Sequence, residues 1–169
     1  FMNSIVSNRS KYDEFLAGEV TLSESEERGR TLFFAEYNPG FPDVSGADCA
    51  HCHGGANFDN NRYMNNGIDV EADQSDLGRE TVTNDPEDKA KFKVTSLRNI
   101  ALTAPYMHDG RFETLEEVVK HYNDGIKLSP TLDPALEYTT QTGLLLDQSD
   151  IEDLVAFLKS LTDITFISN

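Results

Sequence analysis

Cys49-Ala50-His51-Cys52-His53 is the stretch of sequence that decides the fold. It places two thiols three positions apart, followed at once by an imidazole, which is the C-x-x-C-H attachment pattern of c-type haem. Thiols at this spacing reach the two vinyl groups on one edge of a porphyrin, and the histidine after the second cysteine then binds the iron. The pattern therefore predicts one covalent haem c, attached through Cys49 and Cys52, with His53 as proximal ligand.

Two other chemistries use a pair of cysteines. A thioredoxin-like redox pair needs a strand before the motif and a helix after it, within a βαβ unit, and the flanking sequence has no such pattern. A zinc site needs a second pair of ligands, whereas the chain has only two Cys. Haem attachment is the better interpretation, and His51 inside the motif is expected to be exposed.

The composition limits the partners. The chain has 169 residues, which suits one domain, and 30 Asp+Glu against 14 Lys+Arg give a net charge of −16. Nucleic acid and anionic membrane surfaces select for positive charge, so neither is expected, and a cationic partner is favoured. No window approaches the ~18 apolar residues of a spanning helix. Residues 1–5 lack the basic and apolar parts of a signal peptide, so a signal is expected to have been removed, or the chain to be a piece of something longer.

The periodicity predicts an all-α domain with long irregular loops. A short helix is expected within residues 1–20, ending at Gly18, and a capping box at Ser23 opens a helix over 24–34. Residues 35–95 carry few periodic signals. A second capping box at Thr114 opens a helix with an apolar stripe that includes Tyr122, and a third at Ser149 opens the last long helix. The terminal Phe166-Ile167 is expected to pack on the body or on a partner.

The side chain that completes the iron coordination is left open by these patterns. Met107 lies in a loop that is able to cross the far face of the haem, and a methionine ligand suits electron transfer. Tyr122 lies on the apolar stripe of its helix, so its phenol points inward, although such a tyrosine is often a core residue. His121 is one step off the stripe and is expected to be exposed.

Charged residues outside the motif suggest weaker sites. Residues 69–88 are expected to form a solvated acidic loop. Acidic residues at positions 69, 71, 73 and 80 follow an EF-hand-like spacing, but Gln74 stands where the loop needs Gly. Arg79, Arg98 and Arg111 are candidate partners for the haem propionates, because an Arg fork matches a carboxylate, and Arg98 is preferred.

Further downstream, residues 92–112, which include Ala104-Pro105-Tyr106-Met107-His108-Asp109-Gly110-Arg111-Phe112, are followed by Thr114-Leu115-Glu116-Glu117-Val118-Val119. This segment resembles the bacterial di-haem cytochrome c peroxidase family, which also contains the di-haem enzyme that matures methylamine dehydrogenase. The opening Ser10-Lys11-Tyr12-Asp13-Glu14-Phe15-Leu16-Ala17-Gly18 is similar to the family's interdomain entry. The resemblance runs from about Ser4 to Leu161 and covers only the C-terminal half of a full member.

The resemblance implies a fold, a domain division and a role. Residues 1–20 are expected to form an interdomain-type arm, and 21–169 a class I cytochrome c-like haem domain. In the family this half takes electrons from a small redox protein and passes them to a second haem, where hydrogen peroxide is cleaved. Peroxidase activity is therefore expected only if a second haem domain, of the same or another chain, is present.

The resemblance also bears on the ligands. Peroxidases carry a Met fourteen positions after the His of their Tyr-x-His-x-Gly segment, and counting from His108 leads to Tyr122. The maturation enzyme is similar in placing a Tyr ligand there, so Tyr122 is preferred and Met107 is the alternative. The family binds Ca²⁺ between its domains, partly through carbonyls that match Thr103 and Pro105.

The sequence thus predicts a c-type cytochrome domain that transfers electrons through one haem. Two alternatives are a free-standing monohaem carrier and a haem-bearing subunit of a larger respiratory or photosynthetic complex. The expected electron donor is a small basic cytochrome or cupredoxin. Haem attachment through thiols implies the bacterial periplasm or the outer cell surface.

Overall fold

The computed structural model describes residues 6–165, so the expected packing of Phe166 and Ile167 lies outside the described residues. The α-helices are α1 (Lys11–Leu16), α2 (Glu24–Phe34), α3 (Glu80–Thr83), α4 (Leu115–Lys120), α5 (Pro134–Glu137), α6 (Thr139–Thr142) and α7 (Gln148–Ser160). The two short strands β1 (Tyr63–Met64) and β2 (Phe92–Lys93) pair antiparallel, with Met64 opposite Phe92. The chain is otherwise loop and single helical turns, as expected for an all-α domain with long loops.

Four capping boxes mark where the main helices begin. Those at Ser10, Ser23 and Thr114 start α1, α2 and α4. The box expected at Ser149 is wrong, because α7 begins two residues earlier. The Asp147 carboxylate accepts from the backbone N–H of Asp150 at 2.9 Å, and the Asp150 carboxylate accepts from the Asp147 N–H at 3.0 Å. Aspartate is as good an N-cap as serine, so the earlier pair forms the cap.

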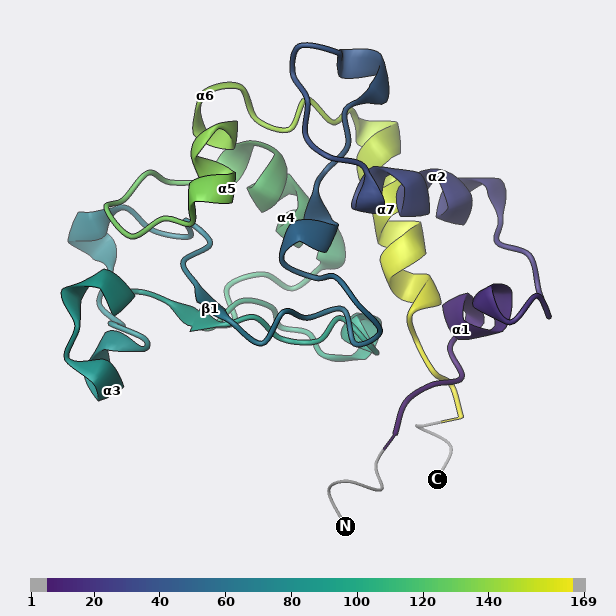
Figure 1. Ribbon diagram of the computed structural model, residues 1–169, viewed down its shortest axis with the longest axis horizontal. Helices are drawn as coiled ribbons and strands as arrows, with labels where there is room; N and C mark the ends of the chain where they lie inside the picture. The colour runs from purple at the N-terminus through teal and green to yellow at the C-terminus, as the bar shows by residue number, and fades with distance from the viewer. Residues whose placement is uncertain (1–5, 166–169) are drawn as a thin grey trace.

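The core lies where α2 and α7 cross (Figure 1). Phe33 of α2 and Phe157 of α7 are 1% and 0% exposed, and their ring centroids lie 5.2 Å apart. Tyr12 of α1 meets Phe157 edge-on at 5.1 Å, and Phe58, from the loop after the cysteine motif, meets both Tyr12 and Phe33. Edge-on aromatic packing of this kind stabilises beyond the area it buries. It ties the motif loop to the helical core.

The N-terminal segment is built into the same body. Asn8 and Arg9 donate their backbone N–H groups to the Asp163 carboxylate, just after α7, at 3.1 and 3.0 Å. α1 lies against the end of α7 in Figure 1, with Tyr12 only 6% exposed. The division at residue 20 stays a prediction, although α1 packs into the same core as α2 and α7.

Residues 69–93 form a second end of the molecule, away from α1, α2 and α7 (Figure 1). α3 is held to the following turn by an Arg79–Asp88 ion pair at 2.8 Å. The carboxylates at 71, 73 and 76 belong to exposed residues, as expected of an acidic surface loop. Within residues 6–165 no helix has both the length and the apolar character needed to cross a membrane.

The helix expected over residues 114–124 changes character part-way. α4 ends at Lys120, and His121–Gly125 continue as a π-helical turn, η7. Single π turns inside α-helices are rare and are frequent at functional sites. This turn carries Tyr122.

Candidate functional site

The cysteine motif forms one tight turn. A 3₁₀ turn spans Cys49–His51 (η3), Asp48 before it adopts a left-handed backbone with φ 49°, and the His53 N–H donates to the Cys49 carbonyl at 2.9 Å. Both cysteines are free of any disulfide. Burial, with smaller contributions from neighbouring carboxylates, raises the pKa of Cys49 to about 12 and of Cys52 to about 11. The turn therefore presents two neutral thiols to the interior.

His53 is held with one ring nitrogen committed. Its Nδ1 lies 3.0 Å from the Phe58 carbonyl oxygen. A carbonyl only accepts, so Nδ1 carries the proton and donates it to Phe58. Burial lowers the pKa of His53 and favours the neutral ring, while hydrogen bonds to the Phe58 and Thr95 backbones oppose this shift. A neutral imidazole with its second nitrogen fixed by a carbonyl is the usual state of a histidine that binds a metal.

Tyr122 presents a buried hydroxyl to the same interior. Burial raises its pKa to about 12, a hydrogen bond from Asn66 lowers it, and the charges of Cys52 and Cys49 raise it further. Tyr122 packs against the hydrophobic core, as expected from its place on the apolar stripe. Its role as an iron ligand stays a prediction.

Met107 reaches the same place from another loop. Its sulfur lies 3.3 Å from the Asn66 Nδ2, and the Tyr122 hydroxyl oxygen lies 3.5 Å from that same nitrogen. The Met107 backbone has φ 73°, in the left-handed region that a residue with a side chain adopts only at a cost. The two alternative ligands therefore meet at one asparagine amide.

His121 and Asn66 are the positions where the sequence-based interpretation fell short. His121, expected to be exposed, is 6% exposed, and its Nε2 lies 3.0 Å from the Asn66 carbonyl oxygen. Its backbone is still α-helical (φ −57°, ψ −47°), so its burial comes from the loop around Asn66, which the stripe could not show. Asn66 sits in an Asn-Asn-Gly run typical of a loop, and no periodic signal marks it.

Arg98 is engaged by protein groups. It forms a bidentate ion pair with Asp13 of α1 at 2.9 and 3.0 Å, and its Nε and Nη2 donate to the Ala56 carbonyl. Ala56 lies just after the cysteine motif, so Arg98 braces the motif loop against α1. Its role as a propionate partner stays a prediction.

The calcium predictions have no side-chain cluster to support them. In the range 6–165 no group of three or more His, Cys, Asp or Glu residues is placed to hold a metal ion. Asp69, the first residue of the EF-hand-like spacing, instead pairs with Arg111 at 2.8 Å. Thr103 and Pro105 lie in an exposed turn after η6 (Ile100–Leu102), and calcium binding by their carbonyls stays a prediction.

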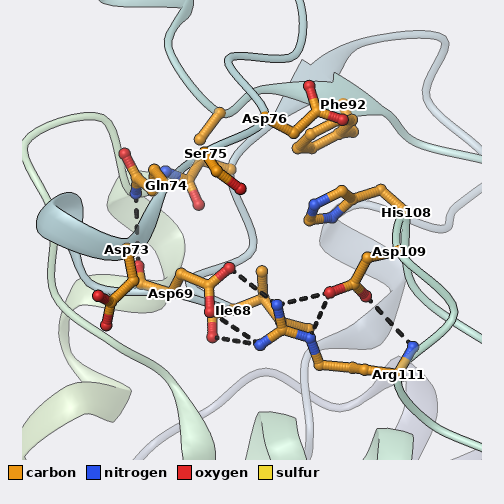
Figure 2. A pocket seen from close by; sticks show the side chains of 12 residues that line it. Ile68, Asp69, Asp73, Gln74, Ser75, Asp76, Phe92, His108, Asp109 and Arg111 are labelled. Carbon is orange, nitrogen blue, oxygen red and sulfur yellow. Dashed lines mark hydrogen bonds and ion pairs between the residues drawn. The ribbon is translucent and has the colours of Figure 1, made fainter.

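A surface hollow lies between residues 68–76 and residues 108–111. Its volume is about 220 Å³. Figure 2 shows Arg111 between Asp69 and Asp109, with both of which it forms ion pairs. The His108 ring stacks on that of Phe92, with centroids 3.9 Å apart. Neither the cysteine motif nor Tyr122 lines it. The hollow is therefore a polar surface feature separate from the thiols.

Comparison with known proteins places this geometry in context. The chain is 32% identical to the cytochrome c peroxidase Ccp of Escherichia coli over 97% of its own length and 31% of the relative. It is 33% identical to the methylamine utilization protein MauG of Paracoccus denitrificans over 91% of its length and 46% of the relative. No protein-family model matches.

Solved structures agree. A MauG-like protein associated with microbial copper homeostasis superposes with a TM-score of 0.74 and 38% identity, over 95% of this chain and 50% of that one. The diheme peroxidase BthA of Burkholderia thailandensis, at 22% identity and a TM-score of 0.67 over 94% of this chain and 47% of that one, shares the fold. The chain spans half or less of the length of each of these relatives.

Proposed function

Because the chain is a homologue of the bacterial di-haem cytochrome c peroxidases and MauG, and matches their C-terminal half, we propose that it is an electron-transfer haem domain of that kind. Cys49 and Cys52 would hold one haem c as thioethers, and His53 would bind its iron. Tyr122 would be a second iron ligand, with Met107 as the alternative. The sequence similarity supports a role as a haem domain. The single haem, its ligands and electron transfer through it are our proposal.

One observation carries the proposal: the hydrogen bond between His53 Nδ1 and the Phe58 carbonyl. It commits Nδ1 to the protein, so Nε2 is the nitrogen for a metal, and the same turn supplies two thiols that form no disulfide. Together these are the donor set that a c-type haem requires. A disulfide or a zinc site would use the thiols differently, and the residues present fit the haem.

Phe58 and Tyr122 would position and tune the haem site. The haem, when bound, supplies reversible one-electron chemistry. Phe58 holds the imidazole in one orientation through its carbonyl and joins the motif loop to the aromatic core through its ring. Tyr122 offers a buried oxygen from η7, and an anionic oxygen ligand stabilises ferric iron. We therefore propose a low-potential site rather than a high-potential carrier.

The second haem lies outside this chain in our proposal. Electrons leave this domain for a second haem domain of the same or another chain, where hydrogen peroxide would be reduced. Peroxidase activity is accordingly proposed only for the two-haem assembly. A free-standing monohaem carrier and a haem-bearing subunit of a respiratory or photosynthetic complex are the alternatives.

A small basic cytochrome or cupredoxin is the proposed donor. The net charge of −16 supports it, as does the carboxylate-rich rim around the hollow of Figure 2. Complementary charge raises the association rate more than the affinity. We propose the periplasm or outer cell surface as the location. Covalent haem attachment needs reduced thiols, which then form thioethers with the haem outside the cytoplasm.

Haem counting tests the proposal. Export the native chain together with the c-type maturation machinery, then measure intact mass and the pyridine haemochrome per polypeptide. We expect one haem for the described domain, and none after Cys49→Ala with Cys52→Ala. Two haems on a longer native polypeptide would favour the peroxidase half over a free carrier. A colourless protein with free thiols, or one holding zinc, would contradict the proposal.

A further inference from the structure

Asn66 is held rigidly between two segments of the chain. Its carbonyl oxygen lies 3.0 Å from His121 Nε2, which donates to it from the π turn. On either side, the Asp133 N–H donates to the Asn65 carbonyl at 3.1 Å and the Lys127 N–H donates to the Gly67 carbonyl at 2.7 Å. These three hydrogen bonds to consecutive carbonyls hold the backbone from which the Asn66 side chain extends.

The amide of Asn66 lies where the two candidate ligands meet. Its Nδ2 is 3.3 Å from the Met107 sulfur and 3.5 Å from the Tyr122 hydroxyl oxygen. An amide nitrogen has two N–H donors, enough for both acceptors at once. Consecutive residues of the π turn thus hold this asparagine twice: His121 binds its backbone and Tyr122 meets its side chain.

We propose that Asn66 is a positioning residue for Tyr122, the candidate iron ligand, because its amide lies within hydrogen-bond distance of the Tyr122 oxygen. This inference rests on the proposed haem and goes one step beyond it. The amide hydrogen bond stabilises negative charge on the phenol oxygen and so weakens that oxygen's donation to a metal.

Substituting Asn66 should therefore change the absorption spectrum and the midpoint potential while the haem stays bound. Removing the amide makes the Tyr122 oxygen a stronger donor, which stabilises the ferric state. The midpoint potential then falls, and the phenolate-to-iron charge-transfer band moves to longer wavelength. If Asn66 had only a structural role, its substitution would lower the stability of the protein and leave the charge-transfer band and the midpoint potential unchanged.

The test compares Asn66→Leu and Asn66→Ala with Asn65→Ala. Asn65 is a matched control, because it is the neighbouring residue of the same type. Its amide donates to Ser129 and Thr131 at 3.1 and 3.0 Å and its oxygen accepts from the Gly67 N–H at 2.9 Å, so it braces the same loop without contacting either ligand. We expect haem-loaded Asn66 variants to show the band shift and the lower potential, and Asn65→Ala to show neither.

A second comparison removes the acceptor. In a Tyr122→Phe background the charge-transfer band is absent, so the midpoint potential is the readout. Asn66→Leu should no longer lower that potential, because the contact of the amide with the phenol oxygen is already gone and only its contact with the Met107 sulfur remains. Haem-loaded Asn66→Leu with a wild-type spectrum and potential would overturn this inference alone. Equal shifts from Asn65→Ala, or an undiminished fall in the potential in the Tyr122→Phe background, would do the same. A wild-type chain without haem would instead overturn the proposed function.

Discussion

Gly29 of α2 and Asp153 of α7 touch backbone to backbone. A Cβ placed on Gly29 would lie 1.9 Å from the Asp153 carbonyl oxygen, a distance that no real contact allows. The absence of a side chain at this one position lets the two helices cross closely enough to bury Phe33 and Phe157. The helix crossing that carries the core therefore depends on one glycine.

Gly29→Ala should be strongly destabilising. The obstacle is backbone rather than a flexible side chain, so α2 and α7 must separate, and we expect a loss of about 3 kcal/mol in the free energy of unfolding. Denaturant titration followed by circular dichroism measures it. Gly40→Ala is the control, because its added Cβ meets only the Asn38 side chain at 3.5 Å, and it should stay within about 0.5 kcal/mol. Equal stability of the two variants would contradict the close crossing.

The Asp13–Arg98 pair should couple α1 to the motif loop. Arg98→Lys cannot reproduce the two-pronged pair and the Ala56 contacts together, so we expect a loss of about 2 kcal/mol. A double-mutant cycle with Asp13→Asn should show most of that loss as coupling. Glu116→Gln with Lys120→Gln, which breaks an exposed pair on α4, should show no measurable coupling. Strict additivity at residues 13 and 98 would mean that the pair does not brace the loop.

Asp153 should make the α2–α7 contact sensitive to acid. The hydrogen bond from Arg28 lowers its pKa below the ordinary value of 3.8, with burial opposing and Ser25 assisting. Because the folded-state pKa is below the unfolded one, this stabilisation is present near neutral pH and is lost as pH falls through and below 3.8. Asp153→Asn should therefore be less stable than wild type at pH 7, and the difference should shrink toward pH 3. Denaturation midpoints across that range measure it, and a constant difference would contradict the linkage.

Tyr122→Phe should change the optical spectrum of the haem-loaded protein, moving the Soret band and removing the charge-transfer band. Met107→Leu should change little, because Tyr122 is the proposed ligand and Met107 the alternative. Electron paramagnetic resonance of both variants supplies an independent readout of spin state. A large rise in high-spin signal in Met107→Leu, with Tyr122→Phe unchanged, would reverse the order of the two candidates.

Reduction by a basic donor should depend on salt. With a net charge of −16, the rate with a small basic cytochrome should fall on the order of tenfold between about 20 mM and about 200 mM salt, as screening removes the attraction. Stopped-flow mixing measures this rate. An uncharged small-molecule reductant is the control and should show little change. A salt-independent rate with the basic protein would argue against that class of partner.

The starts of the helices could be predicted from the sequence because a helix cap depends on residues only a few positions apart. The helix expected over 24–34 coincides with α2, and the boxes at Ser23 and Thr114 form as expected. A capping box depends only on side chains three positions apart. At Ser149 the same reasoning picked the wrong one of two overlapping boxes, since Asp147–Asp150 offers equally good chemistry.

By itself, the sequence determined the C-x-x-C-H attachment pattern, the helical class, the long acidic loops and the inward face of Tyr122. Only the tertiary structure decided that His121 is buried against the Asn66 loop, that Arg98 pairs with Asp13, and that Asn66 meets Met107 and Tyr122. Asn66 and Tyr122 are 56 positions apart, and Arg98 and Asp13 are 85 apart. Contacts across such distances leave no periodic trace in either segment, because the packing of the whole chain brings them together.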